Sequence, residues 1–251
     1  MSATKGAQRL TLLLLPGMDG TGALFDDFVK LLPSWIEPVV VGYPRDRQLS
    51  YDQLSPIVES LVPSDVPFVI LAESFSTPLA VRLAAKAPAR LQALVLCAGF
   101  VSPPRRGLLS CLARFFAPLL FTFGLPESVC RQFLVGNSAS QALVDTVRAT
   151  VSGVSSGVLA HRLRSVLKCK AKCELRSVSV PLLYVAGIED RLITTASFHE
   201  VKQEKPDALV TSIDAPHLLL QAKPREAVAA IVSFLKQIGT DPTEQARSRC
   251  G

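Results

Sequence analysis

Metal-binding and disulfide patterns are missing from this sequence. It has three histidines, and its six cysteines form no CxxC pair and show no histidine-rich companion spacing. Structural metal sites are built from such clusters, so we expect neither a metal site nor a cofactor. Cys97 lies inside an apolar run, where a free thiol behaves as a small hydrophobic side chain. We therefore expect no disulfides and a reducing compartment, the cytoplasm.

A targeting segment and a high charge content are also missing. Residues 1–9 are polar, and the apolar run 10–15 is too short for a secretory signal and leads into Pro16-Gly17 rather than a cleavage site. Charged residues make up 19% of the chain and apolar residues 49%. This composition predicts an ordered chain with a substantial core, of a length that suits one α/β domain with an insertion.

Basic residues gather in one segment. Between residues 102 and 179 the net charge is +8, which leaves −2 for the rest of the chain. No aromatic interleaving or known binding motif accompanies this charge, so we do not expect nucleic acid as a partner. A solvated surface and a site that attracts an acidic partner both remain open.

Near-continuous apolar runs alternate with helical patterns along most of the chain, which predicts a parallel sheet covered by helices on both faces. The expected strands span 10–15, 38–42, 68–72, 91–98, 180–186 and 208–213. Helices are expected at 23–32, 51–61, 78–86 and 197–203, and from about Pro224. The alternation stops between 102 and 179, where only helical patterns occur. We predict a core of residues 1–101 and 180–240, a helical insertion at 102–179, and a flexible tail at 241–251.

One part of the insertion, residues 107–125, is apolar for about the length of a membrane span. Arg114 lies near its middle, and Pro118 and Gly124 interrupt it. A central arginine makes spanning costly, so we expect a helix over a pocket instead. A shallow contact with a membrane surface stays open.

The turn after the strand 68–72 reads Ala72-Glu73-Ser74-Phe75-Ser76. Small residues two positions before and after a serine are typical of a nucleophile elbow, the tight strand-to-helix turn that exposes the serine. Alanine and serine meet this steric demand less generously than glycine. Ser76 is the poorer nucleophile candidate, because Pro78 would fill its second small position. A serine nucleophile also needs a base and an orienting acid.

The acid and the base are predicted from the ends of later strands. Asp190 follows the strand 180–186, where α/β sheets place their sites, and Glu189 is the rival acid. His217 follows the last strand, whereas His161 and His199 are most simply solvated side chains.

We predict Ser74 as nucleophile, His217 as base and Asp190 as the acid that orients it. Acyl chemistry also needs donors for an oxyanion. The backbone N–H groups of Phe75 and Met18 are the candidates, from the elbow and from the loop after the first strand.

Together these motifs resemble the α/β-hydrolase superfamily, in its serine esterase, lipase and thioesterase form with a helical cap. The matching segments are Pro16-Gly17-Met18-Asp19-Gly20, Ala72 to Ser76, Gly187 to Asp190, and Pro216-His217. The resemblance implies an α/β-hydrolase fold, with a mostly parallel sheet, helices on both faces and 102–179 as the cap. The first loop lacks the His-Gly pair of many members, and the elbow lacks both glycines.

The leading functional prediction is hydrolysis of a carboxylic ester or thioester with a hydrophobic acyl group, through an acyl-enzyme. A serine nucleophile argues against the dehalogenases and epoxide hydrolases of this fold, which use aspartate. Acyl transfer to an alcohol stays open, because it differs from hydrolysis only in what the pocket admits in place of water. Residues 16–22 also resemble those of plant plastid acyltransferases of the esterase, lipase and thioesterase type, but that segment is too short to assign acyl transfer. A non-enzymatic ligand-binding protein and a membrane-associated lipase stay open as well. The expected partner is a small hydrophobic ester or thioester, and a basic cap would also suit coenzyme A or an acidic acyl carrier.

Overall fold

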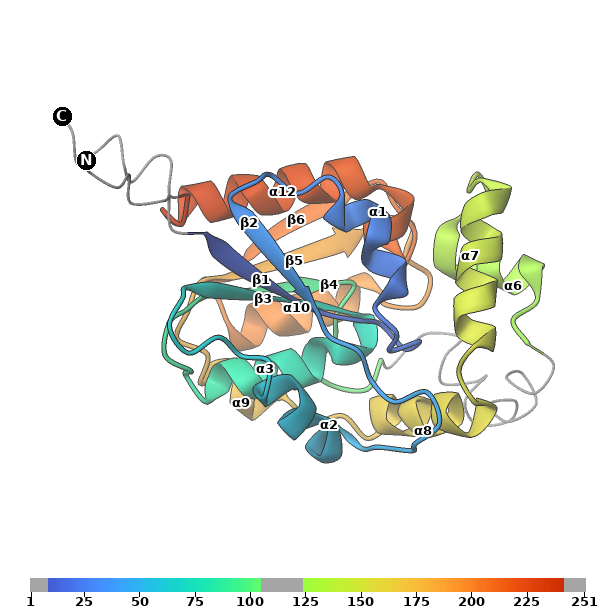
Figure 1. The fold of residues 1–251 in the computed structure, drawn as a ribbon, viewed down its shortest axis with the longest axis horizontal. Coiled ribbons are helices and arrows are strands. Elements are labelled where there is room, and N and C mark those ends of the chain that lie inside the picture. The colour runs from blue at the N-terminus through green and yellow to red at the C-terminus, as the bar shows by residue number, and fades with distance from the viewer. Residues whose placement is uncertain (1–8, 105–123, 242–251) are drawn as a thin grey trace, which may run out of the picture.

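The computed structural model describes residues 9–104 and 124–241. Its sheet has six strands in the order β2-β1-β3-β4-β5-β6, and every neighbouring pair is parallel (Figure 1). The strands are β1 (Leu10–Leu15), β2 (Ile36–Val40), β3 (Phe68–Glu73), β4 (Leu91–Cys97), β5 (Leu182–Gly187) and β6 (Leu209–Ile213). The predicted parallel sheet is confirmed.

Helices cover both faces of this sheet (Figure 1). On one face lie α1 (Asp26–Val29) and α12 (Pro224–Gln237), preceded by α11 (Leu219–Ala222). On the other lie α2 (Tyr51–Glu59), α3 (Thr77–Ala85), α9 (Lys172–Arg176) and α10 (Thr195–Glu204).

Successive side chains of a strand point to opposite faces of the sheet, so each buried strand contributes to the hydrophobic core on both faces. Leu12 and Leu14 pack under α1 and α12, whereas Leu13 and Leu15 face the opposite helices, and all four are fully buried. A parallel strand buried on both faces therefore needs an uninterrupted apolar run, which is what the sequence of β1 provides.

Two predicted elements are shifted. The second strand was expected at 38–42, but β2 spans Ile36–Val40 with Pro38 at its centre, opposite Leu12. Because β2 is an edge strand, it tolerates a proline that cannot donate to a ladder. The helix expected at 23–32 is a 3₁₀ turn, Ala23–Phe25, followed by the four-residue α1.

The described part of the insertion is helical. It contains α6 (Glu127–Cys130), a π-helical turn (Arg131–Val135), α7 (Gln141–Ser152) and α8 (Ser156–Leu167). These elements lie at the end of the sheet toward which the strands point (Figure 1). The following helix, α9, packs instead against α3 and α10 of the core.

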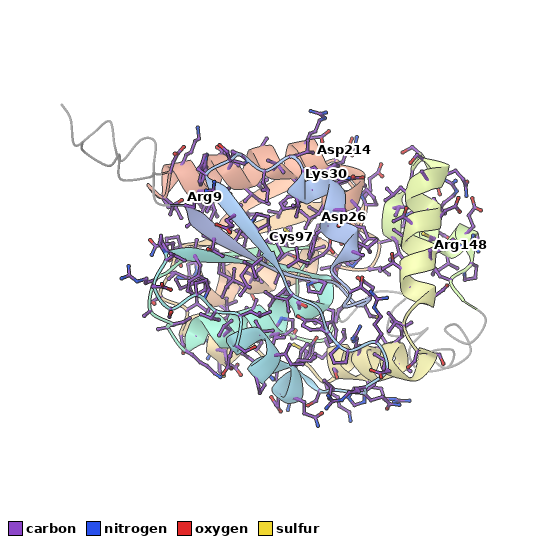
Figure 2. All side chains as sticks on the ribbon, viewed as in Figure 1. Arg9, Asp26, Lys30, Cys97, Arg148 and Asp214 are labelled. Carbon is purple, nitrogen blue, oxygen red and sulfur yellow. The ribbon has the colours of Figure 1, made fainter. Side chains whose placement is uncertain are left out.

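The predicted apolar helix at 107–125 lies almost wholly outside the described residues, and Arg114 with it. Among the helices that the structure describes, none is long and apolar enough to cross a membrane. Cys97, at the end of β4, is a buried free thiol in the interior of the sheet (Figure 2).

Candidate active site

The elbow places Ser74 directly after β3 in a backbone conformation that non-glycine residues seldom adopt, with φ at +46°. A 3₁₀ turn, Ser74–Ser76, then leads into α3. Ser76, at the second small position, also ties the elbow to the loop after β1. Its hydroxyl donates to the Pro16 carbonyl at 2.5 Å and accepts from the Tyr43 hydroxyl at 2.7 Å. A glycine at this position could not make this tie, so the serine has a structural role here.

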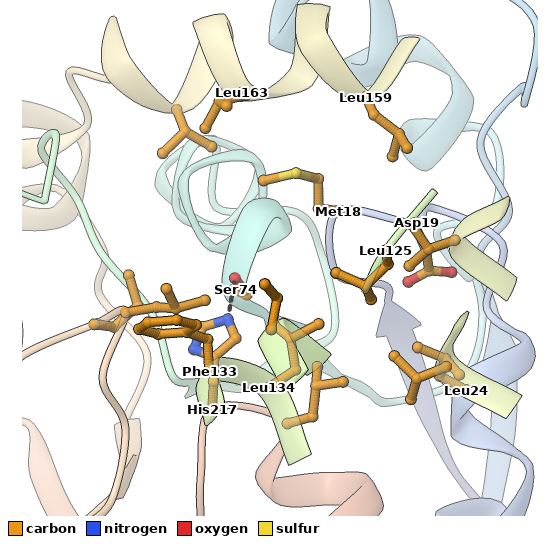
Figure 3. Close-up of a pocket in the computed structure, with 18 of the residues that line it drawn as sticks. Met18, Asp19, Leu24, Ser74, Leu125, Phe133, Leu134, Leu159, Leu163 and His217 are labelled. Carbon is orange, nitrogen blue, oxygen red and sulfur yellow. Dashed lines mark hydrogen bonds between the residues drawn. The ribbon is translucent and has the colours of Figure 1, made fainter. Parts of the chain in front are cut away.

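The three side chains expected to form the catalytic set meet at the carboxyl end of the sheet. His217 Nε2 lies 2.9 Å from Ser74 Oγ (Figure 3), and His217 Nδ1 lies 2.8 Å from Asp190 Oδ2. The other carboxylate oxygen of Asp190 accepts the backbone N–H groups of Leu192 and Ile193, at 2.8 and 2.9 Å. Glu189, the rival acid, is exposed.

A glycine brings the acid and the histidine loops together. A Cβ atom on Gly187, at the end of β5, would lie 2.6 Å from the carbonyl oxygens of both Ala215 and Pro216. No real Cβ atom tolerates such a contact with backbone, so only glycine lets the loop before His217 approach the turn before Asp190. The inserted helical region holds the other side of this loop, because Leu218 N–H donates to the Leu134 carbonyl at 2.8 Å.

The charge on Asp190 governs the titration of His217. Burial alone would lower the pKa of the imidazole, but the negative charge of Asp190 and its hydrogen bond to the ring raise that pKa above 6.5. A histidine with a raised pKa takes up a proton readily, as a general base must.

Glu73 is a buried acid next to Ser74 that sequence reasoning did not single out. Only 1% of it is exposed, and the one hydrogen bond of its side chain among the described residues comes from Gln221 Nε2 at 3.3 Å. Burial, together with the nearby Asp19, raises its pKa to about 8, against the opposing effects of His217 and Gln221. The carboxyl group is therefore largely protonated at pH 7. Glu73 stands between Ala72 and Ser74, and nothing in this part of the sequence indicates that its side chain is buried.

The loop after β1 carries the first expected oxyanion donor, Met18. Among the hydrogen bonds of the described residues, none uses the Met18 N–H. The Asp19 side chain shapes this loop by accepting the backbone N–H and the hydroxyl of Thr21, at 2.8 and 2.6 Å. Phe75, the second expected donor, is fully buried in the elbow.

A cavity of about 160 Å³ opens beside Ser74 and His217 (Figure 3). Its lining is almost entirely apolar and comes both from the part of the chain that forms the sheet and from the inserted helices. The lining includes Leu125, Phe133, Leu134, Val147, Val151, Leu159 and Leu163 of the insertion, and Met18, Leu24, Phe100, Leu192 and Ile193 of the rest of the chain. Leu192 and Ile193 also hold Asp190 through their N–H groups, so one turn orients the acid and forms part of the wall.

The other two histidines lie outside this site. His199 is exposed on α10, as predicted, with its ring 4.1 Å from that of Phe198. His161 on α8 is half-buried rather than solvated, and the prediction for it was wrong because α8 packs against the core. Within the described residues, no cluster of histidine, cysteine and acidic side chains is arranged to hold a metal ion.

The model of one known family, described as serine aminopeptidase, S33, matches residues 43–220. The chain belongs to this family. It is therefore a serine hydrolase of the α/β-hydrolase superfamily, and the fold expected from its motifs is confirmed. A comparison with curated proteins finds no match.

Solved structures of similar fold cover almost the whole chain. MenH from S. aureus is 14% identical with a TM-score of 0.76, over 95% of this chain and 97% of its own. A carboxylesterase structure from Nitrososphaera gargenis is 16% identical with a TM-score of 0.76, over 94% and 93%. The esterase EaEST from Exiguobacterium antarcticum is 12% identical with a TM-score of 0.76, over 90% and 92%. Likeness at such low identities concerns the fold alone.

Proposed function

We propose that this serine hydrolase cleaves a carboxylic ester or thioester whose acyl group is hydrophobic. The observation that carries the proposal is the hydrogen-bonded chain from Asp190 through His217 to Ser74, which opens onto an apolar cavity. A polar reacting group at the mouth of an apolar pocket fits a substrate that has one carbonyl and a hydrocarbon chain.

In the first step, Ser74 Oγ attacks the acyl carbon while its proton passes to His217 Nε2. The imidazolium that forms donates its Nδ1–H to Asp190, 2.8 Å away, which stabilises the charge and fixes the ring. The negative charge that develops on the acyl oxygen would be held by the N–H groups of Met18 and Phe75.

In the second half, the tetrahedral intermediate collapses and the bond to the alcohol or thiol breaks. The leaving group takes the proton from His217 Nε2, and the acyl group stays on Ser74. A water molecule then gives its proton to His217, attacks the acyl carbon and releases the carboxylic acid. The proton returns to Ser74.

The positive charge of the inserted segment also helps to decide which partner the protein binds. We propose residues 102–179 as the cap segment, with α6, α7, α8 and the π-helical turn as the described walls of the pocket. Several of its cations are neutralised within the chain, since Arg131 pairs with Glu127 and Arg176 with Glu204. We therefore favour a small hydrophobic substrate over an acidic carrier protein.

The test is hydrolysis of p-nitrophenyl esters, from acetate to palmitate, by the parent and by Ser74→Ala. We expect turnover by the parent with a chain-length optimum, and its loss in the variant. Product ester formed in the presence of added alcohols would indicate acyl transfer instead. Ligand affinity that is equal in both proteins, without turnover in the parent, would indicate plain binding and refute the proposal.

A further inference from the structure

Arg162 is a buried arginine of the cap helix α8, with 2% of its surface exposed. Its Nη1 donates to the carbonyl oxygens of Met18 and Asp19, at 2.8 and 2.7 Å, and its Nη2 donates to that of Pro44 at 2.9 Å. No carboxylate of the described chain lies within ion-pair distance of it. Its charge is therefore directed at backbone oxygens, mainly those of the loop after β1.

This loop is built to receive the guanidinium group. Gly20 has φ at +68°, and a Cβ atom there would lie 2.4 Å from Arg162 Nη1. The same glycine's carbonyl accepts the Tyr43 N–H at 2.7 Å. The guanidinium carbon also lies 5.9 Å from the centre of the Phe75 ring. Arg162 thus binds the carbonyl of Met18 and lies over the ring of Phe75, and these are the two residues whose N–H groups are proposed to hold the oxyanion.

Helix α8 also forms a wall of the cavity. Leu159 and Leu163, which flank Arg162 on this helix, both line it (Figure 3). One rigid element therefore touches the space for the acyl chain and the loop that carries Met18. A chain packed against these leucines would hold α8, and with it Arg162, in place.

We propose that Arg162 is a positioning residue that links the acyl pocket to the oxyanion loop. It fixes the Met18 N–H for the transition state, and an acyl chain long enough to contact α8 strengthens this hold. The inference rests on the proposed function and adds to it a prediction. In the parent enzyme kcat, and not only KM, improves as the acyl chain lengthens.

The experiment compares the parent with Arg162→Met, Arg162→Lys and Gly20→Ala. Arg164→Met is the matched control, because Arg164 is exposed on the same helix. The concentration of active enzyme is determined for each variant by active-site titration, and kcat and KM are measured for acetate and octanoate esters. The affinity for a trifluoromethyl ketone, which forms a tetrahedral adduct on Ser74, is measured alongside.

We expect Arg162→Met to lower kcat for octanoate by about 10- to 100-fold with little change in KM. Affinity for the ketone should fall by a similar factor, and the rise of kcat with chain length should disappear. Arg162→Lys should recover part of the loss, and Arg164→Met should match the parent. Gly20→Ala should resemble Arg162→Met, and a variant that carries both substitutions should be no less active than the less active single variant.

A lower melting temperature in Arg162→Met with unchanged kcat and ketone affinity would overturn the proposal, since Arg162 would then only cross-link the fold. Absence of ester turnover in the parent would refute the proposed function instead. In that case the rate at which a fluorophosphonate labels Ser74 still tests Arg162. Slower labelling in Arg162→Met than in Arg164→Met would support its role, and equal rates would contradict it. A parent that is not labelled would overturn both proposals.

Discussion

The two sides of the site are built differently. On the core side, Ser74, Asp190 and His217 each follow a strand, and backbone features hold them: a left-handed Ser74, two N–H groups on Asp190, and the close approach at Gly187. The other side is called the cap side here because it is formed by residues of the proposed cap, 102–179. Its walls are apolar side chains of helices that lie far from these strands in the chain. The comparison indicates that the reacting groups depend on local turns, whereas the shape of the pocket depends on how helices pack.

The largest expected effect in this comparison, on the core side, is that of Asp190→Asn. We expect kcat to fall by about 10³- to 10⁴-fold, because an amide cannot hold the same imidazole tautomer or stabilise its positive form. Glu189→Gln, at the adjacent exposed position, is the control and should retain full activity. Steady-state kinetics on a p-nitrophenyl ester check both, and equal losses in the two variants would contradict the assignment.

The pH dependence of kcat/KM also tests the core side. His217 must be neutral to accept a proton, and Asp190 raises its pKa above 6.5. We therefore expect kcat/KM to fall on the acid side through an apparent pKa above 6.5. The measurement is a profile from pH 5 to 9, and a midpoint well below 6.5 would count against His217 as the base.

On the cap side, Leu163→Trp should have a smaller and selective effect. A larger side chain in the wall fills space intended for an acyl chain, so kcat/KM for decanoate should fall by about 10- to 100-fold. Acetate hydrolysis should change by no more than about twofold. Arg164→Ala on the exposed side of α8 is the control. An equal loss for both esters would mean that the cap does not select the acyl chain.

Glu73→Gln should have the smallest effect on activity but a clear effect on stability. The pKa of Glu73 is about 8 in the folded chain, against an ordinary value of 4.5 for a solvated glutamate. As pH rises from 4.5 to 8 the unfolded chain releases this proton while the folded chain keeps it, so the parent loses stability with rising pH. The loss should be about 2–4 kcal/mol between pH 5 and pH 9.

The glutamine side chain in Glu73→Gln is uncharged at every pH, so this variant should not show the loss of stability between pH 5 and pH 9 that Glu73 causes in the parent. Urea unfolding at pH 5, 7 and 9 checks this, with Glu189→Gln as a control that keeps the parent's slope. The interpretation fails if Glu73→Gln and the parent lose stability equally.

Much of the core side could be predicted from sequence, because its signals are local. Apolar runs at 10–15 and 68–72 predicted β1 and β3. The spacing of small residues pointed to Ser74, and a position directly after a predicted strand pointed to Asp190 and His217. The exact limits of β2 could not be predicted, because whether Pro38 is tolerated depends on the strand lying at the sheet edge.

Little of the cap side could be predicted from the sequence. Its pocket walls depend on contacts between helices that no spacing encodes. One signal was available and was missed: Arg162 stands on the apolar face of α8, in the series of Val158, Leu159, Leu163 and Val166. A charged residue in such a series needs a buried partner, and the nearby loop with Gly20 offers its carbonyl groups.

We propose that Ser74 forms an acyl-enzyme whose acyl chain occupies the apolar cavity. It is tested most directly by mixing the protein with p-nitrophenyl octanoate, quenching in acid within the first turnovers, and mapping peptides by mass spectrometry. We expect an octanoyl group on Ser74 in the parent and in Arg164→Met, and none in Ser74→Ala. Ester turnover without a Ser74 adduct, or with the octanoyl group on another residue, would contradict it.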